Sequence, residues 1–235
     1  MMRTKVAAKV NNKDSIKWRS HEPSRIETFS DAAFAFALTL IIVSIEIPKT
    51  FDDLMGTMHG AVSFALCFAV LFNIWNSQNI FFRRYGVNDN TIVTLNAILL
   101  FVVLMYAYPL RFLFDLVTSS EAKQHLMIRQ DQVQSLMLIY GAGFVAIYLL
   151  FYLMHRHVIK MADQLELSAS ELYATRTNTA INLICVCICL VAIAAALILP
   201  GPAGSSGFVY FLFPVAYFVW FSYRGKKRRE LFPEA

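Results

Sequence analysis

Six long apolar runs constrain this chain more than any other feature of its sequence. A helix needs roughly 20 residues to cross the ~30 Å hydrocarbon core of a bilayer, and each run is about that long or longer. Lipid offers no hydrogen-bond partner to backbone N–H and C=O groups, so we expect every run to be a helix. We place the runs near residues 27–48, 55–82, 91–117, 131–157, 173–199 and 206–223.

The composition agrees with a membrane protein. The chain has 235 residues, of which 57% are hydrophobic, and its mean hydropathy is +0.53. A soluble domain of this length does not need so much apolar surface. We therefore predict an all-α polytopic membrane protein embedded in a lipid bilayer. It would comprise a basic tail over residues 1–24, a six-helix unit over 25–224 and a second tail over 225–235.

The lysines and arginines between the runs predict the orientation of the chain, because these residues collect on the cytoplasmic side of a membrane. Seventeen of the 21 lie before the first run, after the second, at or beyond the end of the fourth, at the start of the fifth, or after the sixth. The opposite side has only Lys49, Arg111, Lys123 and Arg129. An even number of spans returns the chain to its starting side, so we predict six transmembrane helices with both termini in the cytoplasm.

The polar residues do not indicate enzymatic chemistry. The sequence contains no His-Glu-x-x-His, Gly-x-Ser-x-Gly or phosphate-binding glycine loop. His155 and His157 are two residues apart, so they would not share a helix face. We therefore expect no catalytic residue, no metal site and no cofactor. The basic residues of the C-terminal tail are already required by the orientation, so we expect no nucleic-acid partner.

The start of the first run combines charges with an apolar segment. Arg25 and the triplet Phe29-Ser30-Asp31 precede and enter this run. Charged groups at that depth are costly unless they are paired or serve a water-filled path. Ser24 and Glu27 have the spacing of a capping box, in which the two side chains bond to each other's backbone N–H. We therefore predict that a helix begins here.

An apolar stripe follows on the same helix. Its members recur at intervals of four, four, three and four residues, which places them on one face: Ala32, Phe36, Leu40, Val43 and Ile47. Thr39 lies beside this stripe. From the residues alone two interpretations remain open. The stripe could line a pore, or it could pack against lipid and other helices while Thr39 bonds to the carbonyl of Ala35.

The pattern Arg-x-x-x-Phe-Ser-Asp from Arg25 to Asp31 resembles the signature of the transmembrane protein 175 family of potassium channels. The resemblance continues through residues 37–40, Glu46 before Pro48, and three further short segments. These segments are Asn73-Ile-Trp75, residues 95–100 and Tyr108-Pro109. All specific matches lie within about residues 25–115, so the first three runs carry the resemblance.

This resemblance implies a homotetramer whose central pore is lined by the first helix of each subunit. It implies a pore and selectivity role for four residues of that helix: Phe36, Thr39, Leu40 and Val43. It also implies a structural role for Arg25, Phe29, Ser30 and Asp31, joined to polar groups on the second and third helices. The candidate partners are Asn73, Trp75, Gln78 and Asn96. We expect Asp31 to be charged and paired, with Arg25 as its best candidate.

Two residues depart from the family pattern. Gln78 stands where a histidine is common, and glutamine cannot take up a proton near neutral pH. Phe36 stands where isoleucine or leucine is usual at the constriction. Four phenyl rings around one axis would give a tighter dewetted gate or, with their faces inward, a weak cation-attracting ring.

We therefore predict a potassium-preferring cation channel of the plasma membrane, in which potassium is the permeant ion. Two alternatives remain. An ion- or proton-coupled secondary transporter would show broken helices and inverted repeats, and the two halves of this sequence share no motif. A non-conducting membrane scaffold would also be compatible with a tight ring of Phe36 side chains.

Overall fold

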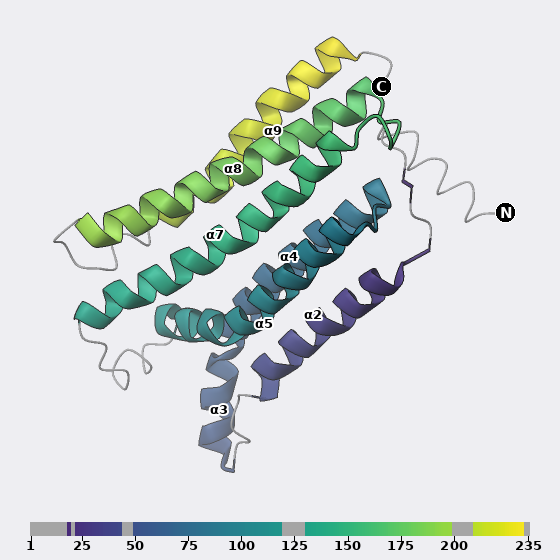
Figure 1. Ribbon diagram of the computed structural model, residues 1–235. Helices are drawn as coiled ribbons and strands as arrows, with labels where there is room; N and C mark the ends of the chain where they lie inside the picture. The colour runs from purple at the N-terminus through teal and green to yellow at the C-terminus, as the bar shows by residue number, and fades with distance from the viewer. Residues whose placement is uncertain (1–17, 20–21, 44–48, 119–129, 199–208, 233–235) are drawn as a thin grey trace.

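The structure, a computed structural model, describes residues 18–19, 22–43, 49–118, 130–198 and 209–232. These residues form helices connected by short segments, and the described part of the chain contains no strand. The helices are α2 (Arg25–Val43), α3 (Phe51–His59), α4 (Ala61–Tyr85), α5 (Asn90–Thr118), α7 (Gln130–Lys160), α8 (Ala169–Ile198) and α9 (Leu212–Leu231). Six of them are long and run side by side, whereas the short α3 projects from the bundle (Figure 1).

Five of the long helices are long and apolar enough to cross a membrane: α2, α4, α5, α7 and α8. They correspond to the first five predicted runs. The sixth run corresponds to α9, which reaches Leu231 and whose last turns carry Arg228 and Arg229. These charges lower its hydropathy, so α9 does not meet the same criterion within the described residues. The chain is therefore a multi-pass helical membrane protein.

The second run was predicted to begin near residue 55, and that start was wrong. The structure assigns residues 55–59 to α3, and the membrane-spanning helix α4 begins at Ala61. Gly60 separates the two helices and provides no side-chain cap. Glycine is about 1 kcal/mol less favourable than alanine inside a helix, which makes this position a natural place for the break.

Helix α5 lies at the centre of the fold, in contact with α2, α4 and α7, while α8 packs between α7 and α9. Gly143 of α7 faces the ring of Tyr106 from α5, and Gly141 faces Ile193 of α8. A side chain at either glycine would overlap these neighbours. The small residues thus allow α7 to approach a helix on each side, as expected for membrane helix packing.

Pro109 lies inside α5 and leaves the helix without one backbone N–H. The hydroxyl of Tyr140 from α7 donates to the carbonyl of Pro109 at 2.7 Å. Beyond this point the last turns of α5 bend away from the bundle axis (Figure 1). Proline is a common cause of such bends, and the tyrosine holds the bend against α7.

Candidate pore-lining helix and its polar anchors

Helix α2 begins with the predicted capping box. The backbone N–H of Ser24 donates to Glu27 Oε1 at 2.9 Å, and the N–H of Glu27 donates to Ser24 Oγ at 3.4 Å. These bonds satisfy backbone groups that have no partner within the helix. The capping prediction is confirmed, and it fixes where the helix starts.

The two faces of α2 have different surroundings. Ser30, Phe34, Ala37 and Ile41 recur every three or four residues and are buried against the bundle. The opposite face is uncovered in the single chain, where Phe36 is 57% exposed and Val43 72% exposed. Ala32 and Thr39 are also exposed on this face, and Leu40 is partly buried. Ile47, the last predicted member of the stripe, lies outside the described residues.

Thr39 makes the local hydrogen bond that the second interpretation of the stripe foresaw. Its hydroxyl donates to the carbonyl of Ala35 at 2.9 Å. A hydroxyl oxygen keeps acceptor lone pairs after donating its hydrogen. Thr39 therefore presents an exposed hydroxyl oxygen on an otherwise apolar face, and its orientation is fixed by its own helix.

A buried polar relay ties α2 to α4 and α5. Gln78 Nε2 of α4 donates to Asn96 Oδ1 of α5. Asn96 Nδ2 donates to Ser30 Oγ at 2.9 Å, and Ser30 Oγ donates to the carbonyl of Ile26 at 2.7 Å. Gln78, Asn96 and Ser30 are all buried. The structure thus brings together three of the residues singled out in the sequence.

Asp31 has a different partner from the one expected. Its Oδ1 accepts the indole N–H of Trp75 at 2.7 Å. Arg25 is exposed, and in the described part of the chain no ion pair joins it to Asp31. The predicted Arg25–Asp31 pair is therefore wrong. An exposed carboxylate keeps part of its hydration, so it does not need a cation in contact. Phe29, the remaining motif residue, is 66% exposed.

Asn73 does not join this group. It lies two residues before Trp75, and residues two apart on a helix point to different sides. The structure places Asn73 in a cavity on the side of α4 that faces α7 and α8. The expectation that Asn73 belongs to the same network as the other motif partners is corrected accordingly.

Arg111 anchors the far end of α2, a contact that the sequence reasoning missed. Its guanidinium donates to the carbonyl of Ile41 in the last turn of α2. Arg111 Nε also lies 3.3 Å from Asp115 Oδ2, one helix turn further along α5. The available signal was an arginine inside an apolar run, which requires a partner.

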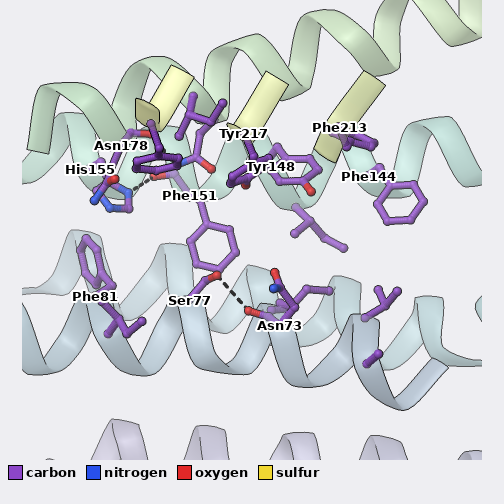
Figure 2. Close-up of a pocket in the computed structure, with 18 of the residues that line it drawn as sticks. Asn73, Ser77, Phe81, Phe144, Tyr148, Phe151, His155, Asn178, Phe213 and Tyr217 are labelled. Atoms are coloured by element: carbon purple, nitrogen blue, oxygen red, sulfur yellow. Dashed lines mark hydrogen bonds between the residues drawn. The ribbon is translucent and has the colours of Figure 1, made fainter. Parts of the chain in front are cut away.

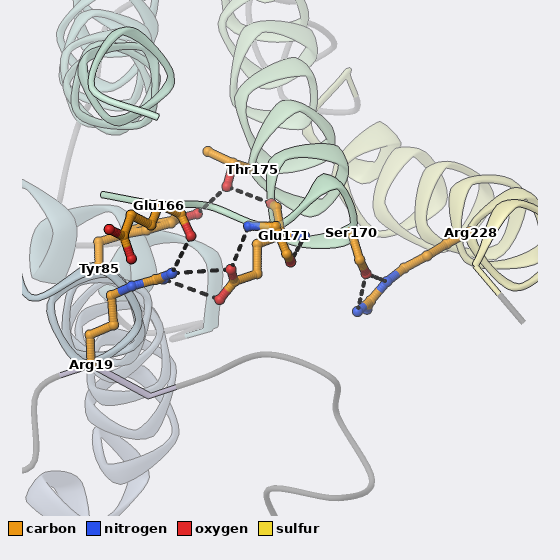
Figure 3. A network of polar contacts seen from close by, with 8 residues as sticks. Arg19, Tyr85, Glu166, Ser170, Glu171, Thr175 and Arg228 are labelled. Carbon is orange, nitrogen blue, oxygen red and sulfur yellow. Dashed lines mark hydrogen bonds and ion pairs between the residues drawn. The ribbon is translucent and has the colours of Figure 1, made fainter. Parts of the chain in front are cut away.

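A second set of polar contacts holds the segment that precedes α2 (Figure 3). Arg19 reaches both oxygens of the Glu171 carboxylate at 3.1 Å, and its backbone N–H donates to the carbonyl of Arg83. Glu171 forms a capping box with Ser168 at the start of α8. Arg228 of α9 donates to Ser170. The Ser-x-x-Glu spacing at Ser168 was the sequence signal for this cluster.

Comparison with known proteins agrees with this geometry. The sequence model of the family described as "Endosomal/lysosomal potassium channel TMEM175" matches residues 25–106. A potassium channel from Marivirga tractuosa is 36% identical over 233 residues, which cover 92% of this chain and 94% of the relative. A potassium channel from Streptomyces collinus is 30% identical over 109 residues, which cover 43% of this chain and 52% of that relative.

Solved structures show the same fold. A crystal structure of a threonine-to-alanine variant of the potassium channel MtTMEM175 is 35% identical, with a TM-score of 0.80, and the match covers 90% of this chain and 97% of that one. A TMEM175 homologue from Chamaesiphon minutus, 21% identical with a TM-score of 0.58, covers 89% of this chain and 99% of its own and is similar in fold. The fold and these relatives thus define a multi-pass membrane protein of the channel class. The chain belongs to the TMEM175 family of potassium channels.

Proposed function

We propose that this chain forms a potassium-preferring cation channel, with a central pore lined by α2 from each of four subunits. The observation that carries the proposal is the division of α2 into two faces. Polar contacts hold one face to α4 and α5, whereas the other is uncovered and carries Phe36, Thr39 and Val43. An exposed apolar face of a membrane helix contacts lipid, a neighbouring subunit or a pore, and the exposed Thr39 hydroxyl on this face favours the pore.

Phe36 forms the main constriction in this proposal, and Leu40 and Val43 form further apolar layers. A narrow apolar throat strips water from a passing ion, and potassium loses its hydration at a lower free-energy cost than sodium. Few protein oxygens replace that water, so the selectivity is modest. The Thr39 hydroxyl oxygen supplies one ligand per subunit beside the constriction. Conduction is passive and follows the electrochemical gradient.

Opening widens the ring of Phe36 side chains by moving or rotating α2. The anchors set limits on that motion, because the Ser30–Asn96–Gln78 relay and the Arg111 contact hold α2 at both ends. Gln78 keeps the relay neutral, since its amide cannot take up a proton near neutral pH. Proton binding at this position therefore does not control the helix.

The assembly is a homotetramer in the plasma membrane with both termini in the cytoplasm, and potassium is its permeant ion rather than a bound cofactor. Native mass spectrometry of the purified protein measures the assembly directly, and the proposal requires a mass of four chains. A monomer that retains potassium flux would contradict it. The transporter alternative receives no support from the described helices, because α2, α4, α5, α7 and α8 each run without a break.

Potassium flux into liposomes that contain the purified protein tests the proposal. We expect uptake in a potassium gradient and much less uptake in a matched sodium gradient, with valinomycin as the control for intact vesicles. Thr39→Ala removes the side-chain oxygen at the constriction and is expected to reduce the preference for potassium. Equal fluxes of both ions through the unchanged protein would reject potassium selectivity.

A further inference from the structure

A cavity of about 630 Å³ separates α4 from α7, α8 and α9. Its volume lies within the range of about 300–1,000 Å³ that is usual for ligand sites. Figure 2 shows side chains of α4 on one wall and of α7, α8 and α9 on the other, pointing into the space between the helices. This cavity lies away from the exposed face of α2, so the proposed pore does not account for it.

The α4 wall of the cavity is one continuous helix face. Its residues recur every three or four positions: Leu66, Val70, Asn73, Ser77, Phe81 and Arg84. At a rise of 1.5 Å per residue this face is roughly 27 Å long. One leaflet of a bilayer has a hydrocarbon depth of about half of 30 Å. An extended acyl chain can therefore lie within the cavity.

The facing wall is aromatic. Phe144, Tyr148 and Phe151 come from α7, and Phe213 and Tyr217 from α9. Such rings give apolar contact to a hydrocarbon chain, and tyrosine presents an apolar ring with a polar tip.

Two of the polar residues in the middle of the cavity are satisfied within their own helices. The Ser77 hydroxyl donates to the carbonyl of Asn73 at 2.9 Å. The Asn182 amide donates to the carbonyl of Asn178 at 2.9 Å. These groups therefore do not require a polar ligand at that depth, and a hydrocarbon chain can pass beside them without leaving a broken hydrogen bond.

Unlike the middle of the cavity, its end at the last turn of α4 contains a charged side chain, that of Arg84. The hydroxyls of Tyr85 and Thr175 share a hydrogen bond of 2.9 Å, and the rings of Phe81 and His155 are 5.2 Å apart, which joins α4 to α7 and α8 there. Arg84 lines the cavity beside these contacts. Its Nε atom is buried and has no hydrogen-bond partner among the described residues. The half-buried Arg84 side chain also bonds to the Tyr85 hydroxyl, so one N–H of the cation is left unsatisfied. A buried donor without an acceptor is costly, so this position favours an anion.

We propose that this cavity binds one anionic phospholipid from the surrounding bilayer. Its phosphate accepts the Arg84 N–H, and an acyl chain lies along the α4 face between the aromatic side chains. Arginine forms strong charge-assisted hydrogen bonds to phosphate, and basic pockets between membrane helices recognise anionic headgroups. The cavity takes a phospholipid rather than a soluble anion because most of its wall is apolar.

Native mass spectrometry of the purified full-length protein in mild detergent tests this site, with added phosphatidylglycerol, phosphatidylcholine or oleate as the probe. We expect retention of phosphatidylglycerol over phosphatidylcholine. Arg84→Gln should lower phosphatidylglycerol retention about tenfold, because it removes a charge-assisted hydrogen bond. The matched control is Arg83→Gln, since Arg83 is the adjacent arginine but lies outside the cavity lining.

A second pair of variants tests where the acyl chain of the lipid lies. Ala69 lines the cavity, whereas Ala65, one turn away on α4, does not. Ala69→Trp should exclude the lipid and Ala65→Trp should not. Equal retention of phosphatidylglycerol and phosphatidylcholine would overturn the proposal, and so would equal effects of Arg84→Gln and Arg83→Gln on phosphatidylglycerol retention. It would also be overturned if oleate were the one probe whose retention depends on Arg84, or if folded Ala69→Trp retained phosphatidylglycerol as the unchanged protein does. If Ala69→Trp fails to fold, the arginine pair decides the question.

Discussion

At the scale of single residues, the relay from Gln78 through Asn96 to Ser30 joins three helices through hydrogen bonds between neutral side chains. Asn96 is its central member, because its amide accepts from Gln78 and donates to Ser30. All three side chains are buried, so each depends on the others for its partner. Removing one group from such a relay leaves another buried without a hydrogen bond.

Asn96→Leu keeps the approximate size of the side chain and removes both bonds. We expect the free energy of unfolding to fall by about 1–3 kcal/mol. Ser30 retains its bond to the Ile26 carbonyl, so the loss falls mainly on Gln78. Thermal unfolding of the purified protein measures the change, and Thr94→Val on the exposed surface of the same helix is the control. Equal stability of the two variants would show that the relay does not hold α2.

At the scale of helices, α2 is stabilised by contacts on one side and at both ends rather than by packing all round. The relay secures its first turns, and Arg111 secures its last turn through the carbonyl of Ile41. Phe34 and Ala37 pack between them in the core. The motion of α2 in the proposed channel is therefore governed by the strength of these two attachments.

Arg111→Gln should loosen the last turn of α2 while leaving its first turns protected. Hydrogen exchange measured by mass spectrometry should show faster exchange around Ile41 and unchanged exchange around Ser30. Asp115→Asn removes the ion pair but leaves the donor to the Ile41 carbonyl, so we expect a smaller effect. If both variants increase exchange equally, the ion pair rather than the carbonyl contact secures the helix.

The contact between α5 and α7 can be tested with a matched pair of glycines. In Gly143→Ala the new methyl group would overlap the Tyr106 ring, which is held in place by the hydrogen bond from its hydroxyl to the Tyr140 carbonyl. We expect a loss of about 1–3 kcal/mol in stability from overpacking. Gly225→Ala on α9 meets no atom within 4 Å, and thermal unfolding should show no loss. A stable Gly143→Ala protein would contradict the close approach of these helices.

At the scale of the whole molecule, the sequence predicts the helices better than the spaces between them. Run length and hydropathy predict where α2, α5, α7 and α8 lie, and the Ser24–Glu27 spacing predicts where α2 begins. The three- and four-residue spacing of Phe36 and Val43 places both on one face, because helical period is a local property. The break at Gly60 was missed because hydropathy averages over it.

Contacts between helices that are far apart in the sequence could not be predicted from run length or helical spacing. Period alone does not say which neighbour a face meets, so Asn73 was grouped with Gln78 although it faces the cavity. The bonds from Arg19 to Glu171 join residues 152 positions apart, and local spacing contains no information about such a pair. The cavity beside Arg84 likewise depends on how far α4 lies from α7, which only the packed structure shows.

The most direct test of the proposed pore compares two exposed phenylalanines. Phe36 is 57% exposed on α2, and Phe101 is 64% exposed on α5. Potassium and sodium flux should be measured in liposomes for the unchanged protein, Phe36→Ala and Phe101→Ala. We predict that Phe36→Ala raises flux and reduces the preference for potassium, because it widens the constriction, while Phe101→Ala behaves as the unchanged protein. A folded Phe36→Ala protein with unchanged flux and selectivity would contradict a pore lined by this face of α2.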